Sequence, residues 1–168
     1  PSSTGVPMSR YLLNSILVTL GTMALTLLIV VTSGYALSKK KFKAKKTLLN
    51  INQMALMFVP VSVMIPRYLV VVNLGLDNNF LAHIVPMLAT PVGLFLVKQF
   101  IDQIPDSILE AARLDGAKDF YIIRKIIIPL VRPALATVAI LTFQAVWNSA
   151  ESSNLYVTDE TIKTFAFY

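Results

Sequence analysis

The stretch Glu110–Pro129, EAARLDGAKDFYIIRKIIIP, decides which fold we expect of this chain. It is charged and helix-prone, it contains a single glycine, Gly116, and it separates two long apolar segments. A membrane protein has little structural reason to keep such a segment beside the bilayer. It has a reason if a soluble partner must grip the protein there, so the surroundings of the stretch decide its meaning.

The composition of the whole chain is that of a membrane protein. Of its 168 residues 55% are hydrophobic and 14% are charged, and the mean hydropathy is +0.67. Soluble domains are roughly 45–50% apolar and about 25% charged. The chain has no cysteine and one histidine, which excludes a disulfide framework and argues against any metal site. The length predicts a single domain over residues 1–168.

Four apolar segments can cross a bilayer, at about 11–38, 47–72, 80–97 and 130–147. The first has no charged residue, and as a helix it would span roughly 40 Å, more than the ~30 Å hydrocarbon core. The second and third contain two prolines each, so we expect them to be kinked and packed inside a bundle. The predicted fold is all-α, a polytopic bundle of four spanning helices with a two-helix loop at 101–129.

The basic residues predict the orientation of the bundle. Lys39–Lys46 carries six lysines in eight residues directly after the first apolar segment, and the positive-inside rule places such a cluster in the cytoplasm. Of the 15 lysine and arginine residues, only Arg10, Arg67 and Lys163 fall outside this cluster and the region 98–132. We therefore expect both chain ends outside and the two-helix loop inside. Attraction to anionic membrane lipids fits this pattern, whereas binding of nucleic acid would need the cluster on a soluble domain.

The first half of the loop predicts a short helix presented to the cytoplasm. Asp106 or Ser107 can cap it, and Ser107 with Glu110 has the S-x-x-E spacing of a capping box. Glu110 and Arg113 are three residues apart, within reach of a surface ion pair, and the two alanines between them would let a partner approach closely. Gly116 should end the helix, since glycine adopts the left-handed C′ conformation without steric cost.

The second half predicts another helix, capped by Asp119 and ended by Pro129. Phe120, Ile123 and Ile127 recur at i, i+3 and i+7, an apolar stripe that could lie against the bundle. Physical reasoning alone leaves open whether this loop is more than an ordinary amphipathic connection between two spans.

The order of residues in the loop favours a function. Glu110-Ala111-Ala112, then Gly116, Ile126 and Ile128-Pro129 at fixed spacing, resembles the EAA loop of ABC-importer permease subunits. Further runs resemble the carbohydrate branch, the maltose-type inner-membrane permeases: Asp115-Gly116-Ala117, Ile65-Pro66-Arg67-Tyr68, Leu74-Gly75-Leu76, and Phe143 with Trp147 and Asn148. Two departures are Ile128, where the family usually has leucine, and the residues after Asn148. Relative to the family, the chain is expected to lack a first and a last spanning helix.

The resemblance implies a division of labour. It places the docking of an ABC ATPase dimer on Glu110, Ala111, Ala112, Arg113, Asp115, Gly116 and Ala117. It implies alternating access driven by that ATPase, which uses ATP and Mg, together with a second permease subunit and an external solute-binding protein. It also implies a location in the cytoplasmic (inner) membrane of a bacterium or archaeon.

The chain itself is expected to be neither an enzyme nor a holder of cofactors. It has no G-x-x-x-x-G-K-[ST] loop and no plausible set of catalytic residues. The alternative is an ATP-independent secondary transporter or channel, which would carry charged residues within its spans and inverted repeats. Only Arg67 and His83 are candidates, and we find no repeat. A structural scaffold would explain the crossings but not the EAA spacing.

The substrate path is the least determined part. Polar residues on or beside the spans could meet sugar hydroxyls, namely Asn52, Gln53, Asn73, Thr90, Gln144 and Asn148. For any one of them, hydrogen bonding between helices is the favoured explanation. A sugar, an oligosaccharide and a polyol are not separated by these residues.

Overall fold

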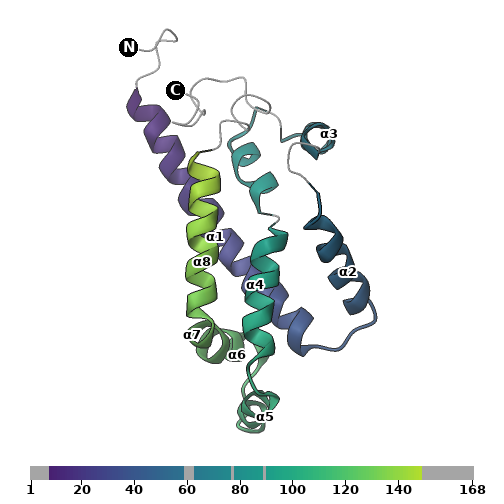
Figure 1. Cartoon of the computed structure of the whole chain (residues 1–168). Coiled ribbons are helices and arrows are strands. Elements are labelled where there is room, and N and C mark those ends of the chain that lie inside the picture. The colour runs from purple at the N-terminus through teal and green to yellow at the C-terminus, as the bar shows by residue number, and fades with distance from the viewer. Residues whose placement is uncertain (1–7, 59–62, 77, 89, 149–168) are drawn as a thin grey trace. The chain divides into compact units, whose positions relative to one another are not determined.

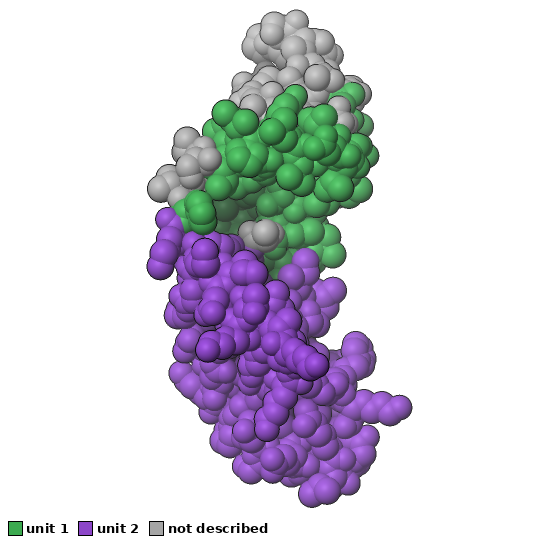
Figure 2. Space-filling model, turned by 90° about the vertical axis from the view of Figure 1, so that its right-hand side faces the viewer, with its two compact units in different colours: residues 1–26, 58–89, 140–168 green, residues 27–57, 90–139 purple. Residues whose placement is uncertain are grey.

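The computed structural model describes residues 8–58, 63–76, 78–88 and 90–148 (Figure 1). Every regular element among them is helical, which confirms the predicted all-α class. The chain divides into two compact units, coloured separately in Figure 2. Unit 1 comprises residues 1–26, 58–89 and 140–168, and unit 2 comprises residues 27–57 and 90–139.

The helix α1, Met8–Lys39, is the one described helix that is long and apolar enough by itself to cross a membrane. At ~1.5 Å per residue its 32 residues are longer than a bilayer core is thick. A second candidate is the pair Asp119–Leu130 and Arg132–Trp147, which meet at a bend of 82°. The predicted total of four spanning helices therefore stays a prediction.

Unit 1 contains three short helices, α3 (Met64–Asn73), η2 (Phe80–His83) and η3 (Val85–Met87), with parts of α1 and of α8 (Arg132–Trp147). Its small core is made of Val18, Ile84 and Val146. On α1, this unit also buries the hydroxyls of Thr19, Thr22 and Thr26, which have no hydrogen-bond partner among the described residues.

Prolines explain why the second and third apolar segments are not continuous helices. Pro66 lies in the first turn of α3, and Pro91 is the first residue of α4, Pro91–Asp102. Proline is tolerated at these positions because the first N–H groups of a helix have no partner inside the helix. Pro91 thus begins a new helix and Pro66 lies in the first turn of another, where the sequence predicted kinks within single spans; Pro60 lies outside the described residues.

Unit 2 holds the larger core and the loop that the sequence singles out. Beside α4 it contains α2 (Lys45–Ala55), α5 (Asp106–Leu114), α6 (Asp119–Ile122), the π-helical turn η4 (Ile123–Ile127) and α7 (Ile128–Leu130). Its core is formed by buried side chains from α1, α4, α8 and the loop, including Val30, Tyr35, Val97, Ile101, Leu109, Ile122, Ile127 and Val138. Burying each large apolar side chain contributes roughly 1.5–3 kcal/mol.

The π-helical turn corrects the apolar stripe predicted for the second loop helix. Ile122 and Ile127 are both 0% exposed, whereas Phe120 is 75% exposed. A π-helical turn needs more residues per turn than an α-helix. Residues five apart can therefore face the same core. Of the predicted stripe, Ile127 is buried and Ile123 packs against the core, but the prediction is wrong for Phe120.

Candidate functional site

The helix α5 ends in a sharp elbow at Gly116. Gly116 has φ of +91°, its N–H donates to the carbonyl of Arg113 at 3.0 Å, and the N–H of Ala117 donates to the carbonyl of Ala112 at 3.0 Å. These two hydrogen bonds form a Schellman motif with glycine at C′. The predicted end of the helix at Gly116 is therefore confirmed. The elbow holds α5 across the lower end of unit 2, below α4 in Figure 1.

The predicted side-chain caps of both loop helices are wrong. Pro105 is the N-cap of α5 and Lys118 that of α6, and neither helix has a side-chain cap bond. Asp106 and Asp119 lie in the first turn of their helices, where negative charge is favourable. Their carboxylates bind lysines at the end of α1 instead of the backbone.

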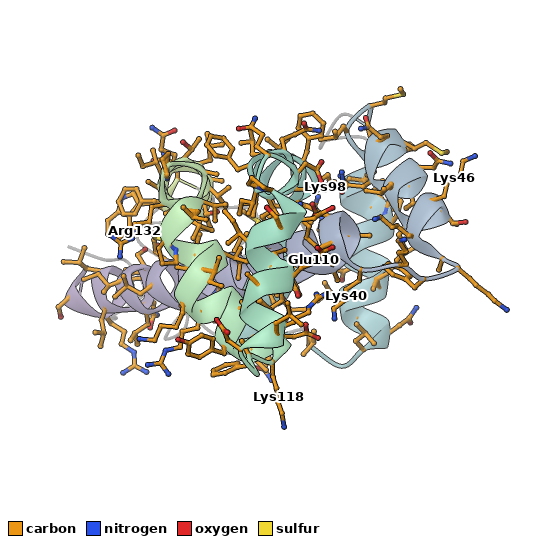
Figure 3. The ribbon with its side chains drawn as sticks, turned by 90° about the horizontal axis from the view of Figure 1, so that it is seen from below. Lys40, Lys46, Lys98, Glu110, Lys118 and Arg132 are labelled. Atoms are coloured by element: carbon orange, nitrogen blue, oxygen red, sulfur yellow. The ribbon has the colours of Figure 1, made fainter. Side chains whose placement is uncertain are left out.

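The exposed face of α5 carries the residues expected to dock a partner. Leu109 is 3% exposed and packs into the unit 2 core with the half-buried Ala112, which leaves Glu110 and Ala111 on the outer side. Leu114 is 88% exposed at the end of the helix. Figure 3 views unit 2 from this end, with Glu110 on α5 and Lys118 projecting away from the ribbon.

A surface pocket of about 730 Å³ adjoins the elbow. It is lined by Ala112, Asp115, Gly116, Ala117, Lys118, Phe120, Tyr121, Lys125 and Ile126. Exposed apolar side chains gathered in one place mark interaction surfaces. Phe120 and Tyr121 line the pocket and are exposed, and Leu114 is exposed at the end of α5. None of these three was among the predicted docking residues. The sequence could have indicated them, because they are large apolar residues within a charged segment.

The end of α1 binds both loop helices through Tyr35. The Tyr35 hydroxyl donates to Asp119 Oδ1 at 2.9 Å and accepts from Arg113 Nη2 at 3.0 Å. Lys40 Nζ lies 2.7 Å from Asp119 Oδ2 and 5.8 Å from the centre of the Tyr35 ring. Hydrogen bonds from Lys40 and Tyr35 lower the pKa of Asp119, and the hydrogen bond with Tyr35 raises the pKa of Arg113. Arg113 thus turns toward Tyr35 rather than forming the helix-surface pair predicted with Glu110.

Two further contacts attach α1 to the start of the loop. Lys39 Nζ donates to Asp106 Oδ1 at 2.8 Å and to the carbonyl of Ile104 at 2.7 Å. The hydrogen bond and charge of Lys39 lower the pKa of Asp106. Ser38 donates to Asp102, which also pairs with Lys98 at 2.7 Å.

A basic pocket of about 450 Å³ lies between the lysines at and after the end of α1 and the helix α5. It is lined by Ser38, Lys39, Lys40, Lys41, Lys45, Asp106, Leu109, Glu110 and Arg113.

The residues predicted for the substrate path fall into both units, and the side chains of three of the six form hydrogen bonds with backbone groups. In unit 2, Thr90 caps α4 by accepting from the N–H of Gly93 at 3.2 Å, and Asn52 donates to the carbonyl of Pro91 at 3.3 Å. The side chain of Asn148 in unit 1 donates to the carbonyl of Gln144 at 2.9 Å. The side chains of the remaining three, Gln53, Asn73 and Gln144, are exposed. Within the described ranges, no three His, Cys, Asp or Glu residues gather closely enough to hold a metal ion.

Comparisons with known proteins agree on one family. The family described as binding-protein-dependent transport system inner membrane component matches residues 11–151. The chain is 34% identical over 145 residues to protein LplC of Bacillus subtilis (strain 168), covering 86% of this chain and 48% of LplC. It is 31% identical over 142 residues to the trehalose transport system permease protein SugB of Mycobacterium tuberculosis (strain CDC 1551 / Oshkosh), covering 83% and 52%.

A solved structure is similar over nearly the whole chain. It is the crystal structure of a bacterial ABC transporter involved in the import of the acidic polysaccharide alginate, with a TM-score of 0.87 and 28% identity. The match covers 98% of this chain and 59% of that chain. The chain therefore spans about half the length of the relatives it matches.

Proposed function

Because the chain belongs to the family of binding-protein-dependent transport system inner membrane components, we propose that it is the permease subunit of an ATP-binding-cassette importer for a carbohydrate. The similar alginate transporter is an ABC importer, and SugB is named for trehalose transport. These names support a sugar or saccharide as the substrate class. The relatives are transporter subunits, so the chemistry of ATP falls to a separate protein.

One observation carries this proposal: α5 presents a charged and apolar face on a rigid elbow. Glu110 and Leu114 are exposed, and the pocket beside Gly116 exposes Phe120 and Tyr121. We propose that Ala111, Ala112, Arg113, Asp115, Gly116 and Ala117 complete this surface and that an ABC ATPase docks on it. Exposed aromatic and apolar side chains around a charge are the composition of protein interfaces.

The proposed cycle assigns each partner a task. The ATPase dimer binds ATP and Mg and closes, which displaces α5 and switches the bundle between inward- and outward-facing states. A second permease subunit completes the pore, and an external solute-binding protein delivers the substrate. The lysines at the end of α1 support placing this loop in the cytoplasm. We further propose that the chain is a multi-pass membrane protein, a single permease domain with four spanning helices.

The substrate path is proposed on polarity alone. Hydroxyl-rich substrates need hydrogen-bond partners along a path, and the six polar residues of the sequence analysis are the candidates. The side chains of Gln53, Asn73 and Gln144 are exposed, so they suit the role better than Thr90, whose hydroxyl caps α4.

Charge reversal at Glu110 tests the docking. In the intact importer, Glu110→Lys should weaken binding of the purified ATPase at least about thirtyfold, since breaking a buried charge pair costs ~2–5 kcal/mol. Lys46→Glu is the matched control, because Lys46 lies on α2 and well away from Glu110 (Figure 3). Equal binding of the ATPase by wild type and Glu110→Lys would refute the docking. Uptake that persists without any ATPase would instead favour a secondary transporter or channel.

A further inference from the structure

Four residues at the end of α1 or directly after it contact the loop, namely Tyr35, Ser38, Lys39 and Lys40. Ser38 binds Asp102 at the end of α4, and Lys39 binds Asp106 at the start of α5. Tyr35 and Lys40 bind Asp119 at the start of α6. The last turns of α1 and Lys40 after them thus contact the loop before α5, on α5 and after the elbow, which attaches α1 to the proposed docking surface at several points.

Tyr35 is the most deeply buried of these four residues. Its side chain is 2% exposed and its ring belongs to the unit 2 core, while its hydroxyl reaches Arg113 and Asp119. Both partners lie at the surface, in the last turn of α5 and the first turn of α6. A rigid aromatic ring therefore carries a hydroxyl from the core to the two helix ends that meet at Gly116.

The hydroxyl bridges two charges that do not bond each other closely. Arg113 Nη2 lies 3.8 Å from Asp119 Oδ1, beyond ordinary hydrogen-bond length, whereas each lies 3.0 Å or less from the Tyr35 oxygen. Arginine can only donate and an ionised carboxylate can only accept. A phenol does both at once, accepting from the cation and donating to the anion, and such charge-assisted bonds are stronger than neutral ones.

We propose that Tyr35 is a positioning residue for coupling, whose hydroxyl holds α5 and α6 at a fixed angle about Gly116 and ties both to α1. When α5 is displaced, the long helix α1 then moves with it, because the angle between α5 and α6 at Gly116 stays fixed. This inference rests on the proposed function, because it assumes that an ATPase moves α5. It adds the residue that converts this movement into movement of a spanning helix.

Tyr35→Phe removes one oxygen and keeps the ring that packs in the core. In the intact importer in proteoliposomes, docking of the purified ATPase should stay within about twofold of wild type. The stimulation of ATP hydrolysis by the permease should fall about tenfold or more, the factor that hydrogen bonds to charged partners support. Thr32→Val is the matched control, since the Thr32 hydroxyl, one turn earlier on α1, bonds only to the carbonyls of Leu28 and Ile29 within the same helix.

A distance measurement separates positioning from mere folding. The chain has no cysteine, so thiols introduced at exposed Phe42, after α1, and exposed Ser107, on α5, can carry a unique pair of spin labels. With Tyr35 present, the distance between the labels should be the same without nucleotide and after trapping with ATP, Mg and vanadate. With Tyr35→Phe, trapping should change or broaden that distance, because α5 then moves without α1.

Two results would overturn the inference. One is a Tyr35→Phe importer with wild-type stimulation and wild-type label distances in both states. The other is a loss of ATPase binding as large as the loss of stimulation, which would make Tyr35 part of the docking surface. If Tyr35→Phe does not fold, Asp119→Asn decides in its place, since it weakens the same bridge from an exposed side chain. Failure of the docking itself is reported separately by Glu110→Lys.

Discussion

Replacing Gly116 by alanine tests the elbow with the smallest possible change. The residue has φ of +91°, in the left-handed region that only glycine adopts freely. A Cβ added there would meet no heavy atom within 4 Å. Steric overlap is therefore absent, and any effect of the substitution must come from the backbone conformation.

The expected cost follows from two routes open to the chain. Alanine held in the left-handed conformation is destabilised by roughly 1–2 kcal/mol. The chain can avoid this strain by opening the last turn of α5, which loses the hydrogen bonds to the carbonyls of Ala112 and Arg113. Each such bond contributes about 1 kcal/mol, so both routes cost about the same. Gly116→Asn should cost less than Gly116→Ala, since asparagine tolerates this region better, and Gly116→Val should cost most.

Gly75 provides a matched control. It also has positive φ, +73°, and open space around the position of a Cβ, and it follows α3 in unit 1. Gly75→Ala should therefore lower the free energy of unfolding by a similar amount, measured by denaturant titration in detergent. Only the substitutions of Gly116 should also lower ATPase stimulation in the reconstituted importer. The loss should be smallest for Gly116→Asn, larger for Gly116→Ala and largest for Gly116→Val.

Two results would refute the role of the elbow at Gly116. If Gly75→Ala reduces stimulation as much as Gly116→Ala does, the loss reflects global stability and the elbow has no special role. If Gly116→Ala leaves both stability and stimulation at the wild-type level, the left-handed turn does not hold α5 in place. A graded loss confined to Gly116 supports the elbow.

Three further outcomes follow from the structure. Gly93→Ala should destabilise unit 2 by about 1–3 kcal/mol in chemical denaturation, because its Cβ would lie 2.9 Å from Thr90 Cγ2 and disturb the cap of α4. Thr22→Val should raise the free energy of unfolding by roughly 1 kcal/mol, since a buried hydroxyl that has no hydrogen-bond partner among the described residues is replaced by a methyl group of the same shape. Acidification should detach the loop: the pKa values of Asp106 and Asp119 are lowered from 3.8, so their contribution to stability is complete above that pH and is lost as the pH falls through the lower folded-state values. Unfolding titrations from pH 7 to pH 2 should show this loss, and Asp119→Asn should reduce it.

Local signals in the sequence predicted the parts of the site that depend on local physics. The end of α5 at Gly116 follows from the conformational freedom of glycine, and the long uncharged helix α1 follows from hydropathy. The order of residues around Glu110 identified the loop as the segment of interest. None of these inferences requires knowing which residues meet in space.

The errors arose where a distant residue competed with a local pattern. Asp106 and Asp119 were expected to cap their helices, but each is the first residue inside its helix, and its carboxylate binds Lys39 or Lys40 from far along the chain. Phe120 was placed inward because an α-helical period was assumed across a π-helical turn. Neither effect is visible in a window of neighbouring residues.

The lysine cluster shows why a single pattern can carry two meanings. Counted as charge, Lys39–Lys46 predicts orientation, and any lysine in it is interchangeable with another. In the structure the members differ, because the Lys39 side chain is only 8% exposed against 76% for its partner Asp106. A buried ammonium that loses its carboxylate is costly, whereas an exposed carboxylate that loses its ammonium returns to water. Lys39 and Lys40 therefore attach the loop to the end of α1, so two of the lysines that predict the orientation of the helix also hold the proposed docking surface on it.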